Sequence, residues 1–325
     1  MMYTPKENFI HFYHNDPVEW TPMADDICMF QPEEINLYIA RGFVLQQEPF
    51  PVEKYGGPDW FGVEWTYDPV SRGSMEVSHP LSDISEWEEK IVFPNLDDYD
   101  WEGIGKKNAD YLNTDKMIAT TIFSGFFERL ISFVGFENAA IALIDEEQQE
   151  DVHKLFSRLA DLYIDYIRRF HEHYGAMHVC IHDDWGTQRG LTFSPDVHTE
   201  MIRPYIQRVI DAVHAMGMSY EQHSCGKVVQ LIPAMIEMGV DTWLGQDLGD
   251  LNNKDALIAE YGDQFKFGVT LPKLSTTDLE ASKPEIRAIV EKYAPKRVWT
   301  RCDRTYTPEQ KAYTYAYTRE LGSKR

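Results

Sequence analysis

The sequence predicts a single (β/α)8 TIM barrel with an N-terminal insertion over the barrel mouth. The chain has 325 residues, which suits one barrel of roughly 250 residues with insertions. Short apolar stretches alternate with helical segments from Lys116 onward, and this alternation predicts a parallel sheet. Hydrophobic residues make up 43% of the chain, which is enough for a sizeable core.

The strands are predicted from apolar, β-branched stretches, and the helices from apolar residues at steps of three and four. The expected strands are 117–123, 177–182, 218–223, 241–244, 265–270 and 298–300. The helices expected among them include 126–134, 145–174, 195–216 and 228–238. Upstream of the regular region, we expect a strand that starts at 20–23 and a helix over 31–40.

Residues 45–110 differ from the rest of the chain. They are rich in Pro, Gly, Trp and acidic residues, as in Gly56-Gly57-Pro58-Asp59-Trp60, and their periodicity is poor. We interpret the segment as an insertion packed over the barrel, so that residues 1–325 form one domain.

The charge balance excludes several partners. Asp and Glu number 53 against 31 Lys and Arg, a formal net charge of −22, which argues against binding to nucleic acid or anionic membranes. The 4 cysteines are not needed as a disulfide framework in so long a chain. Neither an apolar signal segment nor a run of 18 apolar residues occurs, so we expect a cytoplasmic protein without a membrane span.

One candidate metal site lies where the strand 218–223 ends. Side chains alternate between the faces of a strand, so Glu221, His223 and Cys225 point the same way. In a barrel, an imidazole and a thiolate would then meet at the carboxyl-terminal mouth, where catalytic residues of this architecture gather.

Cys302 follows another expected strand and supplies a third ligand. A His-Cys-Cys set is a catalytic zinc pattern with one open coordination position, and thiolates favour zinc over magnesium or calcium. Buried cysteines are more often small hydrophobes, and that alternative stays open. Glu221 is a fourth ligand, a general acid or base, or the partner of an arginine.

A second candidate cluster follows the strand 177–182. Asp183 and Asp184 are adjacent carboxylates in a Gly-containing loop, where one would orient a substrate group or share a proton. A helix N-cap or a loop turn is the alternative. Asp184 lies further past the strand end, and we therefore prefer it as the catalytic residue.

At these residues the sequence resembles the uroporphyrinogen decarboxylase superfamily, specifically its corrinoid-linked methyltransferase branch. The resemblance covers most of the chain and is carried by the stretches 20–22, 59–63, 124–130, 183–186, 194–195 and 223–226. Residues 59–62 and 96–101 are similar to members assigned to bacterial O-demethylase systems. The Arg-rich signature with which the decarboxylase branch holds a polycarboxylated tetrapyrrole is missing, because residues 15–26 are acidic.

The resemblance implies a barrel and a zinc ion (Zn2+) held by His223, Cys225 and Cys302. It implies a zinc-dependent methyltransferase that moves a methyl group from a small methylated donor, here an aryl methyl ether, to the Co(I) of a separate corrinoid (cobalamin) protein. Asp184 and Glu221 would position the donor or manage the leaving-group proton.

Three alternatives remain open at this point. The first is methyl transfer from methylcobalamin to a thiol, the second is tetrapyrrole decarboxylation, and the third is a non-catalytic corrinoid-binding role. The sequence also leaves open the identity of the donor and of the corrinoid protein, and whether the chain forms a homodimer.

Overall fold

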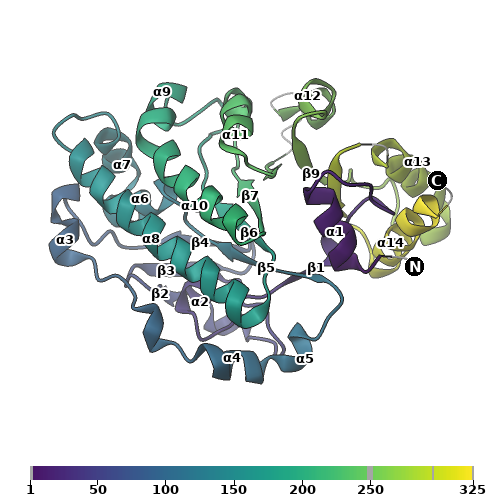
Figure 1. Ribbon diagram of the computed structural model, residues 1–325, viewed down its shortest axis with the longest axis horizontal. Helices are drawn as coiled ribbons and strands as arrows, with labels where there is room; N and C mark the ends of the chain where they lie inside the picture. Colours follow the sequence, from purple (N-terminus) through teal and green to yellow (C-terminus); the bar gives the residue numbers. More distant parts are fainter. Residues whose placement is uncertain (1–2, 247–251, 295, 324–325) are drawn as a thin grey trace. The chain divides into compact units, whose positions relative to one another are not determined.

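The structure, a computed structural model, describes residues 3–246, 252–294 and 296–323, and its fold is α/β and TIM-barrel-like. Figure 1 shows the strands and helices of each part. The chain divides into two compact units, which are described separately here. The first unit comprises Met29–Thr114 and Ile118–Val240. The second comprises Met1–Cys28, Asp115–Met117 and Asp241–Arg325. That residues 1–325 act as one domain stays a prediction.

Three parallel strands centre the first unit and confirm three predicted strands. They are β5 (Met117–Ile122), β6 (His178–His182) and β7 (Ser219–His223). The register pairs β5 with β6 and β6 with β7, and it sets His182 opposite His223. The carboxyl ends of β6 and β7 are therefore level with each other.

Helices follow these strands as the apolar spacing predicts. They are α6 (Phe127–Val134), α7 (Phe136–Ala142), α8 (Gln149–Tyr174), α9 (Pro195–Val197), α10 (Arg203–Ala215) and α11 (Ile232–Met238). The long helix α8 buries a stripe of apolar side chains at steps of three and four, and α10 packs on it. A π-helical turn over His198–Ile202 separates α9 from α10, so the helix expected over 195–216 is interrupted.

The upstream predictions were wrong at their boundaries. The strand expected from 20–23 is instead β1 (Ile27–Met29), because Ala24–Asp26 forms a 3-10 turn (η1) first. The Asp26 carboxylate fixes this turn by accepting hydrogen bonds from the Trp20 ring (3.2 Å) and the Met23 backbone (2.9 Å). The expected helix 31–40 begins later, as α2 (Asn36–Arg41). Gln31 is extended there and forms a bridge with Leu45.

The expected insertion folds within the first unit. Its elements are η2 (Val52–Lys54), β2 (Gly57–Pro58), β3 (Glu64–Asp68), β4 (Gly73–Glu76), η3 (Ile84–Glu86), α3 (Trp87–Lys90), η4 (Leu96–Asp98), α4 (Trp101–Lys107) and α5 (Ala109–Leu112). The strands β2, β3 and β4 form an antiparallel sheet, and α3 and α4 contact α8. The tryptophans of the segment are buried: Trp60, Trp65, Trp87 and Trp101. They therefore belong to the core of this unit.

The second unit also carries parallel strands, in the order β8 (Thr242–Leu244), β9 (Lys266–Thr270) and β10 (Val298–Arg301). They confirm the three strands predicted in this part of the chain. Among the described residues of this unit, the α-helices are α1 (Pro5–Tyr13), α12 (Lys254–Tyr261), α13 (Leu279–Tyr293) and α14 (Pro308–Gly322). Helices α13 and α14 pack against each other.

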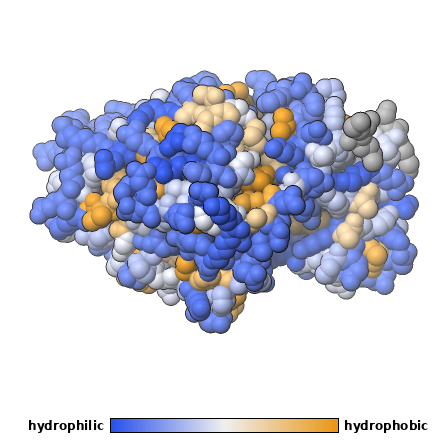
Figure 2. Space-filling model, turned by 60° about the horizontal axis from the view of Figure 1, so that its bottom comes forward, coloured by the Kyte–Doolittle hydropathy of each residue, from blue (hydrophilic) through white to orange (hydrophobic). Residues whose placement is uncertain are grey.

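The face drawn in Figure 2 is mostly hydrophilic, with small separate hydrophobic areas. This agrees with the large excess of acidic residues in the sequence. In the part of the chain that the structure describes, no helix is both long enough and apolar enough to cross a lipid bilayer.

His198 is a buried histidine in the first unit, and we expect it to make this unit sensitive to acid. Neither ring nitrogen has a hydrogen-bond partner among the described residues, and the ring lies 4.8 Å from that of Trp185. Burial, helped by Arg203, lowers the pKa of His198 to about 4. Between about pH 6.5 and pH 4, His198 is therefore protonated in the unfolded chain but neutral in the folded chain. The free energy of unfolding falls as the pH drops through this range.

Between pH 7 and pH 4.5, we expect the free energy of unfolding to fall by about 2–3 kcal/mol more in the wild-type protein than in a His198→Leu variant. Urea unfolding at both pH values measures this difference. Equal pH dependence in the two proteins would show that His198 is protonated in the folded state.

Candidate functional site

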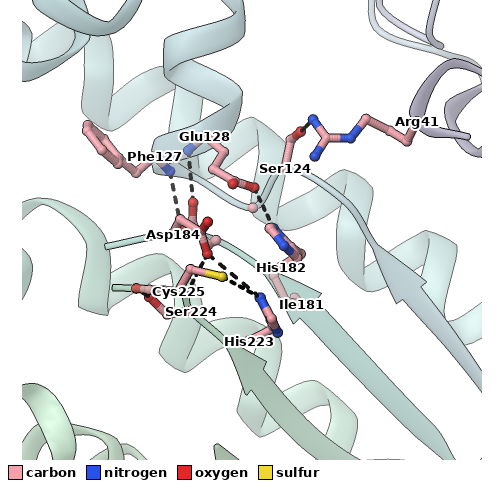
Figure 3. Close-up of polar contacts among 12 residues, drawn as sticks. Arg41, Ser124, Phe127, Glu128, Ile181, His182, Asp184, His223, Ser224 and Cys225 are labelled. Atoms are coloured by element: carbon pink, nitrogen blue, oxygen red, sulfur yellow. Dashed lines mark hydrogen bonds and ion pairs between the residues drawn. The ribbon is translucent and has the colours of Figure 1, made fainter. Parts of the chain in front are cut away.

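The carboxyl ends of β6 and β7 bring four side chains together. The register places His182 beside His223, and their rings stack 4.2 Å apart at 17° (Figure 3). Asp184 and Cys225 each lie two residues beyond these histidines, in the loops that leave the two strands. We call His182, Asp184, His223 and Cys225 the strand-end cluster.

The distances within the strand-end cluster fit a metal site. The Cys225 Sγ lies 3.3 Å from His223 Nε2, and Asp184 Oδ1 lies 3.9 Å from the same nitrogen. The ligand atoms of His182, Asp184 and His223 all lie within 4.8 Å of one another. In a tetrahedral zinc site, nitrogen and sulfur ligands are about 3.5 Å apart. His182, Asp184 and His223 therefore offer imidazole and carboxylate donors at a spacing that one metal ion can bridge, and Cys225 places a thiol beside His223.

Glu128 orients His182. Its carboxylate accepts a hydrogen bond from His182 Nδ1 at 2.9 Å, which leaves Nε2 available to a metal. Burial lowers the pKa of His182, but the charge of Glu128 outweighs this and raises it. Burial raises the pKa of Glu128, but His182, together with the charges of Arg41 and Arg129, outweighs this and lowers it. Metal-binding histidines typically donate their second N–H to such a carboxylate.

The two adjacent aspartates have different positions. Asp183 is buried, and it accepts hydrogen bonds from the backbone N–H groups of Phe126, Phe127 and Glu128 at the start of α6. It is therefore a helix cap, the alternative that the sequence left open. Asp184 is only half-buried, and its Oδ1 accepts the backbone N–H of Cys225 at 2.6 Å. Burial, followed by the charge of Glu128, raises the pKa of Asp184.

The other predicted site residues are more distant or lie in the other unit. Glu221 is buried on β7, where it pairs with Cys180 of β6. It shares a face of the strand with His223 but comes two residues earlier, which separates the two residues by about 7 Å along the strand. Cys302 directly follows β10 in the second unit, so its proximity to His223 stays a prediction. Burial, together with Asp25, raises the pKa of the Cys302 thiol to about 11.

The sequence interpretation missed His182 and Glu128. A signal for His182 was present, because His182-Asp183-Asp184 and His223-Ser224-Cys225 share the same spacing at the ends of neighbouring strands. Each strand ends in a histidine that is followed two residues later by a second possible ligand. Glu128 had no such signal, because its role depends on how the start of α6 lies over the end of β6.

The sequence matches the family described as Uroporphyrinogen decarboxylase (URO-D) over residues 127–299. The chain belongs to this family. The matched region runs from the start of α6 into β10 and contains the whole strand-end cluster. Cys302 lies beyond it.

Among solved structures, the chain is similar to a methyltransferase from Methanosarcina mazei. The TM-score is 0.64 at 16% sequence identity, over 98% of this chain and 99% of that one. This likeness shows the fold. An intracellular xylanase from Thermoanaerobacterium saccharolyticum gives a TM-score of 0.39 at 10% identity, over 61% of this chain and 69% of that one. An endo-1,4-beta-xylanase from Caldicellulosiruptor owensensis gives a TM-score of 0.39 at 11% sequence identity, over 67% of this chain and 75% of that one. No curated protein matches the chain.

Glu128→Gln is expected to weaken zinc binding by about 10–100-fold, because the amide leaves His182 less basic and less firmly oriented. Competition with a chromogenic chelator measures the affinity. Glu137→Gln is the matched control, since Glu137 is exposed on α7. Equal zinc affinity in the two variants would mean that His182 is not a ligand.

Proposed function

We propose that this protein is a zinc-dependent methyltransferase that moves a methyl group from an aryl methyl ether to the Co(I) of a corrinoid protein. The observation that carries the proposal is the strand-end cluster, with His182 held by Glu128. Its donor set suits zinc, and it stands at the strand ends where TIM-barrel enzymes place their active sites. Membership of the family and the likeness to the M. mazei methyltransferase support the proposal.

His223 and Cys225 would hold the ion, and Asp184 lies close enough to His223 to join them. Cys302 is the further ligand that the family resemblance implies. Zinc bound there would supply a Lewis acid that polarises the ether oxygen of the donor.

The carboxyl groups of Asp184 and Glu221 would assist departure of the phenol. Cleavage of the methyl C–O bond leaves an electron pair on the phenol oxygen, which then takes up a proton. Asp184 would position the donor or give this proton, and that role is an alternative to binding the zinc ion, because a carboxylate that binds zinc stays ionised. Glu221, deeper on the same face of β7, would position the aromatic ring of the donor or act as a further ligand.

The test is a coupled assay of the zinc-loaded protein with free cob(I)alamin and a panel of methoxyaromatic compounds. We expect one demethylated phenol to be released for each cob(I)alamin consumed. Methyl transfer from methylcobalamin to a thiol without any reaction of methoxyaromatics would contradict the proposed donor. Release of carbon dioxide from uroporphyrinogen would place the chain with the decarboxylases.

A further inference from the structure

The loops that leave β6 and β7 stay joined beyond the ends of the two strands. The Cys225 backbone N–H donates a hydrogen bond to Asp184 Oδ1 at 2.6 Å (Figure 3). Further along the same loops, the Lys227 N–H donates to the Thr187 carbonyl at 2.8 Å. Asp184 and Cys225, two donors of the strand-end cluster, therefore lie between the paired strands on one side and this second loop contact on the other.

Gly226 lies against the backbone of the facing loop. A Cβ atom at Gly226 would lie 2.2 Å from the Gly186 carbonyl carbon and 2.6 Å from the Thr187 nitrogen. Both are backbone atoms, so no side chain can rotate away to make room. Because ordinary contact of a Cβ atom begins at 3.4 Å, any larger residue would push the two loops apart by about 1 Å. Gly226 also has a φ of 76°, a left-handed conformation that favours glycine.

Gly186 is needed for space alone. Its φ lies outside the left-handed region, so the backbone conformation there does not require glycine. A Cβ atom at Gly186 would nevertheless lie 2.8 Å from Val228 Cγ1 and 3.1 Å from the Cys225 carbonyl oxygen. Val228 is fully buried, so its methyl group has little room to move. The two facing glycines thus let the two donor-bearing loops approach each other backbone to backbone.

We propose that Gly186 and Gly226 are positioning residues whose close backbone contact holds the donors of the strand-end cluster at metal-binding spacing before a metal arrives. The proposal rests on the zinc site proposed above. Metal–ligand distances tolerate changes of only about 0.2 Å, and a site that is about 1 Å too loose loses its function. Loops pushed apart by about 1 Å would therefore carry Cys225 and Asp184 out of reach of a shared ion.

The first test measures zinc affinity by chelator competition in two matched pairs of variants, with circular dichroism to confirm folding. Gly226→Ala is compared with Gly217→Ala, because Gly217 has a similar φ of 72° but nothing within 4 Å of an added Cβ atom. Gly186→Ala is compared with Gly190→Ala, because Gly190 lies in the same loop and an added Cβ atom there would also meet nothing within 4 Å. We expect the affinity to fall by at least about 10-fold in Gly226→Ala and Gly186→Ala, and by less than about 3-fold in the two controls. Equal zinc affinity within either pair of folded variants would overturn the proposal.

The second test uses metal-free protein. Amide hydrogen exchange at Cys225 and Lys227 should be slow in wild type, because both N–H groups are bonded to the facing loop, and at least about 10-fold faster in Gly226→Ala and Gly186→Ala. Fast exchange at both amides in metal-free wild type would show that the loops are not held together in advance, and the proposal would fail. If the variants lose the slow exchange but wild type binds no zinc, the loop contact stands and the proposed zinc-dependent function fails. If zinc binds equally to the variants and their controls, that function stands and the role of the glycines fails.

Discussion

Replacing Cys225 by alanine is expected to reduce methyl transfer to cob(I)alamin by more than about 100-fold. Loss of an orienting partner of a zinc ligand already costs roughly 10–100-fold, and loss of a ligand should exceed that. Cys225 lies 3.3 Å from His223 Nε2, so its removal takes away the softest donor of the strand-end cluster. The measurement is the rate of release of demethylated product at saturating zinc.

Cys28→Ala is the control for this experiment, because it removes a buried thiol from the other unit. It should retain most of the activity. A Cys225→Ala protein that keeps wild-type activity at the same zinc concentration would contradict the assignment of the thiolate as a ligand.

The second large effect concerns stability. Asp59→Ala is expected to lower the free energy of unfolding by about 3–5 kcal/mol, because it leaves the fully buried Arg129 without its counter-charge. Asp59 also accepts hydrogen bonds from the backbones of Phe61 and Val63 and from the Trp65 ring. All these groups would lose their partner at once. Denaturant unfolding followed by tryptophan fluorescence gives the change.

Glu64→Ala provides the comparison, since Glu64 is exposed on β3 a few residues away, and its effect should stay within about 0.5 kcal/mol. Asp59→Asn should be less damaging than Asp59→Ala because the amide retains one acceptor oxygen. If Asp59→Ala unfolds at the same denaturant concentration as Glu64→Ala, the insertion is not anchored through this ion pair.

The Asp59–Arg129 pair also explains two of the motifs on which the family resemblance rests. Asp59 stands in the stretch 59–63 and Arg129 in the stretch 124–130, which are far apart in the sequence. The structure joins them in one buried ion pair between the insertion and α6. Motifs that resemble a family's functional signature thus include residues whose role here is to hold the fold.

The strands and helices of the regular region could be predicted because each buries one face or a continuous apolar run. The period of the apolar residues is then visible in the sequence, as it is in α8. The start of β1 could not be predicted, because it depends on the Asp26 carboxylate closing a turn onto Trp20 and Met23. The helices and strands within the insertion could not be predicted either. Elements as short as β2 show no periodic pattern of apolar residues, and they are stabilised by tertiary contacts.

In the candidate site too, some features could be predicted from the sequence and others could not. Alternation along one strand predicts that His223 and Glu221 share a face, and the loop position singles out Asp184 over Asp183. The proximity of His182 to His223 depends on the register between β6 and β7, which a single sequence does not contain.

The most direct test of the central claim is the metal content of the purified protein beside its His223→Ala variant, with circular dichroism to confirm that both are folded. We predict about one zinc per chain in wild type and almost none in the variant, because His223 is the residue that Cys225 and Asp184 both face. Wild-type protein that stays free of zinc after dialysis against it, or a folded variant that retains the full amount, would contradict a zinc-centred methyltransferase.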